Sequence, residues 1–175
     1  MKKKGFISLI FSLFPFLPFN GRASFNYDAM IYLDAEDLAE AGIKEAYEKD
    51  VLPLLRRYVE RPASIEEILD NYSGSYSVVA NGKQYDIYDK QADGCGPWPR
   101  ATYAMFDIVN RQLASSDRKF YAFYSSNDLC GMFLTAEEYQ RCVDEIIQNK
   151  ASRSNLPYFP TMETPWFGFP HDEGF

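Results

Sequence analysis

The spacing of hydrophobic side chains changes repeatedly along residues 24–150, and each change predicts a new secondary-structure element. Short apolar runs at 27–33, 119–125 and 129–134 are typical of buried strands. Three longer segments instead place apolar residues every three or four positions, which is the spacing of a helix that buries one face. Strands and helices are therefore interspersed, as in a mixed α and β domain.

The first helical segment directly follows the strand at 27–33. Asp34 is placed to cap it, and apolar residues then recur at helical spacing as far as Tyr58. Pro53 lies inside this stretch and cannot donate a backbone hydrogen bond. We therefore expect the helix to kink or restart near Leu52.

The other two long helices carry start signals of different kinds. Pro97 and Pro99 suit the entrance of the middle helix, and Thr135 forms a capping box with Glu138 at the start of the last one. The buried faces are expected to be Ala101, Met105, Ile108, Val109 and Gln112 in the middle helix, and Tyr139, Cys142, Val143 and Ile146 in the last.

A further capping-box pattern occurs between the first two long helices. Ser64 is followed three residues later by Glu67, which predicts a second, short helix at this point. This helix would precede a hairpin.

Asn81-Gly82 predicts the hairpin, because both residues tolerate the positive φ of a type I′ turn. In the register that this turn imposes, Val78 faces Tyr85 and Tyr76 faces Ile87, so all four apolar side chains share one side. The polar side then consists of Ser77, Gln84 and Asp86.

The predicted element order is strand, helix, short helix, hairpin, helix, two strands and helix. Hairpins bring antiparallel pairing, so we expect an α+β fold with a mostly antiparallel sheet of about five strands and three or four helices. These elements occupy 24–150. A tail rich in proline and aromatic residues follows at 151–175, and we expect it to pack on the domain because aromatic area is costly to expose.

The beginning of the chain matches a secretory signal. Lys2 to Lys4 form a basic start, an uncharged apolar run extends to Phe19, and the small residues Gly21 and Ala23 follow. The run is shorter than the roughly 20 residues of a membrane-spanning helix. We expect residues 1–23 to be removed on export, which leaves a periplasmic protein, or alternatively a secreted one, with no stable membrane anchor.

Removal of this signal makes the chain more acidic. Lys2 to Lys4 and Arg22 are lost, so 18 basic residues become 14 against 25 acidic ones, and the net charge of −7 becomes −11. Such a surface repels phosphate backbones and anionic lipids. We therefore expect no nucleic-acid partner and favour a basic protein partner.

Three cysteines, Cys95, Cys130 and Cys142, remain after removal of the signal. In an oxidising compartment two of them are expected to form a disulfide, and the sequence leaves the pairing open. Cys95 lies in a Gly-rich loop, whereas Cys142 is on the apolar side of the last predicted helix.

The residues that usually support catalysis or metal binding are sparse. His171 is the only histidine, and its place in the tail is a poor one for a general base. Three scattered cysteines and one histidine lack the paired spacings of a zinc site, and there is no Gly-rich phosphate loop. We expect no cofactor, no metal and no enzymatic activity.

Carboxylates leave one catalytic alternative open. A hydrolase could use a pair of acids, and the candidates are Asp34, Asp86, Asp89, Asp93 and Asp128. A helix cap, a polar strand face or a turn accounts for Asp34, Asp86 and Asp128 without catalysis.

The loop at 88–98 is the candidate contact surface. Tyr88, Asp89, Asp93 and Trp98 combine carboxylates with large aromatic rings, which suits a basic partner that docks by aromatic anchors. The alternative for Trp98 is that it is simply the first core residue of its helix.

Three segments of the chain resemble the small immunity proteins that accompany polymorphic and type VI-type bacterial toxins. They are Tyr27 to Leu33 with the acidic helix after it, Phe120 to Ser125, and above all Cys130 to Tyr139. The resemblance implies a periplasmic protein that binds and blocks one incoming toxin.

The sequence therefore predicts an exported acidic binding protein, and the resemblance favours an immunity protein whose partner is a basic toxin or enzyme. Two alternatives stay open. One is an exported inhibitor of host lysozyme or of a protease, and the other is an envelope hydrolase that uses paired carboxylates.

Overall fold

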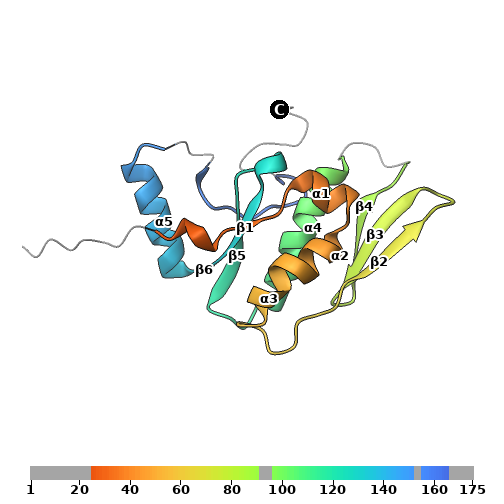
Figure 1. The fold of residues 1–175 in the computed structure, drawn as a ribbon, viewed down its shortest axis with the longest axis horizontal. Helices are drawn as coiled ribbons and strands as arrows, with labels where there is room; N and C mark the ends of the chain where they lie inside the picture. Colours follow the sequence, from red (N-terminus) through yellow and green to blue (C-terminus); the bar gives the residue numbers. More distant parts are fainter. Residues whose placement is uncertain (1–24, 91–95, 152–154, 166–175) are drawn as a thin grey trace, which may run out of the picture.

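Two antiparallel sheets form the framework of the protein (Figure 1). The computed structural model describes residues 25–90, 96–151 and 155–165. The first sheet has the order β1-β6-β5 and the second has the order β2-β3-β4. The strands are β1 (Ile31–Tyr32), β2 (Glu66–Asp70), β3 (Ser75–Ala80), β4 (Lys83–Tyr88), β5 (Arg118–Phe123) and β6 (Cys130–Thr135).

Helices separate and cover these strands. The α-helices are α1 (Ala35–Glu40), α2 (Ile43–Ala46), α3 (Leu52–Leu55), α4 (Pro97–Gln112) and α5 (Ala136–Gln148). Short turns of other types are η1 (Tyr27–Ala29), η2 (Tyr47–Val51), which is π-helical, and η3 (Ser126–Asp128). The predicted α+β class is confirmed, although the strands divide between two sheets instead of forming one.

One predicted element is wrong. Ser64 and Glu67 were expected to start a short helix, but 66–70 is the strand β2, which pairs with β3 in a regular antiparallel register. The carboxylate of Glu67 does not turn back to its own backbone. It accepts hydrogen bonds from the hydroxyl of Tyr76 (2.7 Å) and the amide of Lys44 (3.1 Å). These long-range bonds outweigh the local capping pattern.

The Asn81-Gly82 hairpin is confirmed, with φ values of 52° and 71° at the turn. Val78 pairs with Tyr85 as expected, but a bulge shifts Tyr76 from Ile87 to Tyr88. The apolar side chains of the hairpin are still buried. The predicted placement of Ser77 on the polar side was wrong, because its side chain is buried.

The segment at 27–33 is only partly a strand, because η1 occupies Tyr27–Ala29 and β1 contains only two residues. Asp34 caps α1 as expected and accepts from the amide of Glu36 at 2.9 Å. Gly42, with a φ of 114°, then separates α1 from α2. The expected restart at Leu52 is confirmed, because the π-helical turn η2 ends there and α3 begins, with Pro53 in its first turn.

Helix α4 joins the two sheets into one core. It contacts β4 of the second sheet, β5 of the first sheet and α1 (Figure 1). Of its predicted face, Ala101, Met105, Ile108 and Val109 are fully buried, whereas Gln112 is half-buried. The ring of Phe106 stacks on Phe120 of β5 at 4.8 Å between centroids. The side chain of Asn110 also bonds both backbone groups of Phe120, at 2.8 Å each. The position of this helix therefore fixes the two sheets relative to each other.

Helix α5 lies at the far end of the molecule from β2 (Figure 1). Its capping box of Thr135 and Glu138 is confirmed. Cys142 and Ile146 of its predicted face are buried against Phe123 and Leu134 of the first sheet. This cluster forms a second, smaller core.

The described part of the tail, 155–165, packs on the domain. Tyr158 forms an isolated antiparallel bridge with Ala122 of β5, through two backbone hydrogen bonds of 2.9 Å. Its hydroxyl donates to the carbonyl of Tyr124 at 2.7 Å, and Phe159 stacks on Tyr121. The expected signal at 1–23 and the end of the tail lie outside the described residues.

Candidate functional site

The four residues predicted as a contact surface have different environments. Tyr88 ends β4 with 43% of its surface exposed, and the exposed Asp89 follows it. Trp98 lies in the first turn of α4, half-buried, and packs against the main core. Asp93 lies outside the described residues. Of the predicted set, Tyr88 and Asp89 are therefore the described members that face solvent.

Tyr88 lies in a groove that the sequence did not predict. The groove measures about 360 Å³ and is called the Tyr88 groove below. Its lining residues come from the end of α1, the second sheet and the start of α4: Ala39, Glu40, Ala41, Gly42, Glu67, Leu69, Tyr76, Tyr88 and Pro97.

Cross-strand pairing builds the floor of this groove. Leu69 of β2 pairs with Tyr76 of β3, and Tyr76 pairs with Tyr88 of β4. The three side chains therefore form a row across one face of the sheet. Tyr76 is buried under the helices, whereas Leu69 extends beyond them with 68% of its surface exposed.

Hydrogen bonds hold the polar wall of the groove in place. The amide of Ile43 donates to the hydroxyl of Tyr76 (3.0 Å), which itself donates to Glu67 (2.7 Å). Burial, and then the hydrogen bond to Glu67, raise the pKa of Tyr76, so the phenol stays neutral. A methyl group on Gly42 would lie 2.7 Å from Glu67 Oε1, so only glycine fits here without a shift.

The groove thus has an apolar floor and a rim with two carboxylates, those of Glu40 and Glu67. Apolar surface that is left in water is favourable to cover, and carboxylates attract cations. The pair Ile68-Leu69 could have indicated this site from the sequence. It did not, because the segment was predicted to be a helix instead of a strand.

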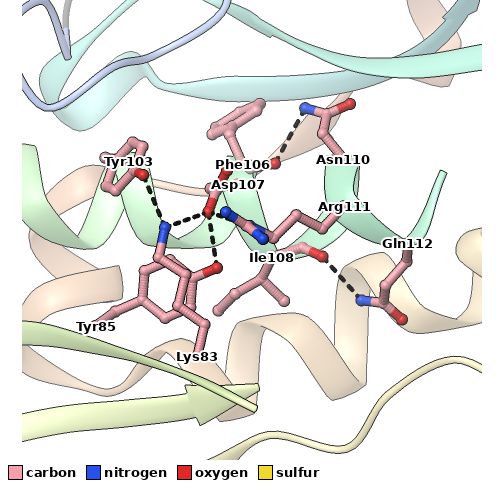
Figure 2. A network of polar contacts seen from close by, with 9 residues as sticks. All are labelled: Lys83, Tyr85, Tyr103, Phe106, Asp107, Ile108, Asn110, Arg111 and Gln112. Carbon is pink, nitrogen blue, oxygen red and sulfur yellow. Dashed lines mark hydrogen bonds and ion pairs between the residues drawn. The ribbon is translucent and has the colours of Figure 1, made fainter. Parts of the chain in front are cut away.

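A second polar cluster, on the neighbouring face of α4, centres on Asp107. Figure 2 shows its carboxylate between Lys83, Tyr85 and Arg111. One oxygen, Oδ2, lies 2.8 Å from the Nζ of Lys83, the hydroxyl of Tyr85 and the Nε of Arg111. Lys83 also donates to the hydroxyl of Tyr103 at 3.0 Å. The cluster links β4 to α4.

The protonation states in this cluster are fixed. Burial alone would raise the pKa of Asp107, but the hydrogen bonds from Lys83, Arg111 and Tyr85 outweigh burial and lower it. Burial and the bond to Asp107 raise the pKa of Tyr85. Each group therefore keeps its ordinary charge at neutral pH, and the cluster acts as a structural link. From the sequence, the only sign of this cluster is that Asp107 and Arg111 are four residues apart, which suits an ion pair on a helix.

A hollow of about 490 Å³ lies beside this cluster. It brings together Asp86 and Asp89, two of the candidate paired acids, with the cations Lys83 and Arg100. Because the charges in the hollow balance, it offers a basic partner less attraction than the Tyr88 groove does.

The other two described candidate acids lie on different elements from Asp86 and Asp89. Asp34 caps α1, and Asp128 lies in η3, which contacts α1. The amide of Asp34 donates to the carbonyl of Leu129, the neighbour of Asp128, at 3.3 Å. Asp86 accepts a hydrogen bond from the side chain of Gln84 at 2.8 Å. Asp93 lies outside the described residues.

The predicted disulfide is not formed by the two cysteines that the structure describes. Cys130 is half-buried, Cys142 is buried, and both are free thiols. Burial raises the pKa of Cys130 and raises that of Cys142 to about 11, so both thiols are protonated at neutral pH. The structure therefore contradicts a bridge between Cys130 and Cys142. Cys95 lies outside the described residues, so the two pairings that include it stay predictions.

Within 25–90, 96–151 and 155–165, there is no group of three or more His, Cys, Asp or Glu side chains placed to hold a metal ion. Within the same ranges no helix has the length and apolar character to cross a membrane. His171 lies outside them.

Comparison of the chain with models of protein families, with curated proteins and with solved structures finds no match.

Proposed function

We propose that this protein is an exported acidic binding protein, and specifically an immunity protein that binds and blocks a cognate toxin. The observation that carries the proposal is the Tyr88 groove, in which the exposed Leu69 and Tyr88 lie beside the carboxylates of Glu40 and Glu67. The secretory pattern of 1–23 supports export.

The composition of the groove suits a protein partner. Binding hot spots concentrate in aromatic and large apolar side chains that become fully desolvated in the complex. Covering an exposed leucine contributes about 2 kcal/mol from burial alone. Leu69 and Tyr88 offer such area next to a cavity large enough for a side chain of the partner.

Charge supports a basic partner. The chain without residues 1–23 has a net charge of −11, and the rim of the groove adds local carboxylates. Many toxins act on anionic substrates through basic clefts, and an acidic inhibitor would be steered toward such a cleft during association. An immunity protein that occupies the cleft would exclude the substrate.

The direct test is binding and rescue. The protein purified from the periplasm is titrated with the product of the adjacent gene and, separately, with lysozyme. Nanomolar affinity for the neighbour, with rescue of cells that export it to their periplasm, is the expected result. Tight binding to lysozyme alone would replace this proposal with the host-inhibitor alternative, and binding to neither would remove it.

Substitutions in the groove test the contact surface. Tyr88→Ala and Leu69→Lys should each weaken binding of the toxin by about 2 kcal/mol, which is about 30-fold, because each removes an anchor. Ile147→Lys is the matched control, since Ile147 is an apolar residue, 63% exposed, on α5 at the other end of the molecule. If both groove variants bind within about twofold of the wild type, as the control should, the groove is not the interface.

A further inference from the structure

The open edge of the second sheet at β2 is a place where the partner could bind by adding a strand. This inference rests on the proposed function. β2 is the terminal strand of the order β2-β3-β4, and in Figure 1 it forms the outer border of that sheet. Among the described residues, no strand pairs with its outer side. Four of its five residues are exposed, and Glu67 is half-buried.

The other sheet edges that the structure describes are short or have neighbours. Tyr158 of the tail bonds both backbone groups of Ala122 and so covers the edge of β5. β1 has only two residues, and β4, with six residues, contacts α4. β2 is a five-residue edge strand whose outer side pairs with no described strand and which exposes large apolar side chains.

β2 lacks most of the features that prevent a strand from joining another chain. Proteins protect such edges with proline, charged side chains (lysine above all), bulges or very short strands. Of these, β2 has only charge, in the form of carboxylates. Residues 66–70 contain neither proline nor lysine, and their register with β3 is regular throughout. The edge instead exposes two large apolar side chains, Ile68 at 42% and Leu69 at 68%.

The charges on β2 decide which strand can join it. Glu66, Glu67 and Asp70 are acidic, so a second copy of β2 would place carboxylates beside carboxylates, which is destabilising. A strand with lysine or arginine would instead form favourable cross-strand pairs. Charge therefore favours a basic segment of another protein over self-association.

We propose that an extended segment of the partner, with basic and apolar residues in alternation, adds to the edge of β2 as a fourth strand of the β2-β3-β4 sheet. Backbone hydrogen bonds would supply affinity, and alternate side chains would supply specificity. On one face the added strand lies beside Glu67 and Leu69 and continues the row that leads to the Tyr88 groove. On the other face it meets Glu66, Ile68 and Asp70.

Two capped peptides of equal charge test this mode on the full exported chain. The first is Lys-Val-Lys-Val-Lys-Val-Lys, which can form a strand, and in the second proline replaces each valine, which removes those backbone donors and disfavours pairing. The strand-forming peptide should bind at least about tenfold more tightly and should slow amide hydrogen exchange of 66–70. Equal binding of the two peptides, or binding of neither, would overturn the proposal.

A pair of variants adds an independent measurement. Ile68→Lys places a positive charge on the edge strand and should weaken the strand-forming peptide about tenfold or more, whereas Ile147→Lys adds the same charge to α5 and should change binding less than twofold. Equal effects of the two variants would mean that the affinity for the peptide depends only on the net charge of the protein.

The outcome is separable from that of the proposed function. If the toxin binds but hydrogen exchange of 66–70 stays unchanged in the complex, edge pairing is wrong while the immunity role stands. If the strand-forming peptide pairs with β2 but neither the toxin nor lysozyme binds, the edge mode stands and the immunity role fails.

Discussion

At the scale of single residues, Gly131 is the one among the described glycines where packing leaves least room for a side chain. A Cβ atom there would lie 2.1 Å from the ring of Phe120. That ring is fully buried and packs between Phe106 and Phe133, at 4.8 and 4.6 Å between centroids, so it has no free space to move into. Glycine at this position therefore allows β6 to approach the centre of the core.

Gly131→Ala should lower the free energy of unfolding by about 3 kcal/mol, because overpacking of a filled core strains its neighbours. Urea unfolding of the purified protein measures the loss. Gly96→Ala is the comparison, since its new methyl group would meet only Pro99, at 4.0 Å, and the loss should stay within about 1 kcal/mol. Equal losses for the two variants would contradict the packing argument.

At the scale of elements, the link between β4 and α4 through Asp107 gives a prediction about pH. The folded state holds the pKa of Asp107 below its unfolded value of about 4. The stabilisation from this charge is therefore complete above about pH 4 and is lost as the pH falls through the folded pKa.

Asp107→Asn should reduce stability at pH 7 by about 1–3 kcal/mol and should flatten the loss of stability on acidification. Unfolding midpoints between pH 7 and pH 2 measure both effects. Asp86→Asn, which removes an exposed carboxylate from β4, should leave the midpoint at pH 7 nearly unchanged. If the stability of Asp107→Asn falls as steeply on acidification as that of the wild type, other carboxyl groups dominate the acid unfolding. Glu138 is the first to consider, because its pKa is also lowered.

Elements whose signals are local were predictable from the sequence. The Asn81-Gly82 turn, the cap at Asp34 and the capping box at Thr135 each depend on contacts within a few residues, and each is confirmed. β2 was not predictable, because the bonds of Glu67 to Tyr76 and Lys44 that hold it are distant in sequence. The Tyr88 groove depends on β2, so it was missed together with that strand.

At the scale of the whole molecule, the tail completes the first sheet. Tyr158 covers the edge of β5, and Phe159 covers the ring of Tyr121 at 4.4 Å between centroids. A chain that ends at residue 151 should therefore unfold about 2–4 kcal/mol more easily than one that ends at residue 165, because the edge of β5 and two aromatic contacts become exposed.

Light scattering at increasing protein concentration gives a second measurement for this pair of truncated chains. The chain that ends at 151 should self-associate through the exposed edge of β5, whereas the one that ends at 165 keeps the bridge to Ala122 and should remain monomeric. Identical stability and identical scattering for the two chains would mean that the bridge contributes nothing measurable.

The topology of the first sheet also bears on the order of folding during biogenesis. β1 comes from the beginning of the domain, but its pairing partner β6 comes near the end, and Ile31 pairs with Gly131. During synthesis β1 therefore has no strand to pair with until most of the chain has left the ribosome. Sheets that join distant segments fold slowly. Because β6 is the pairing partner of both β1 and β5, the first sheet can form only after synthesis has passed residues 130–135.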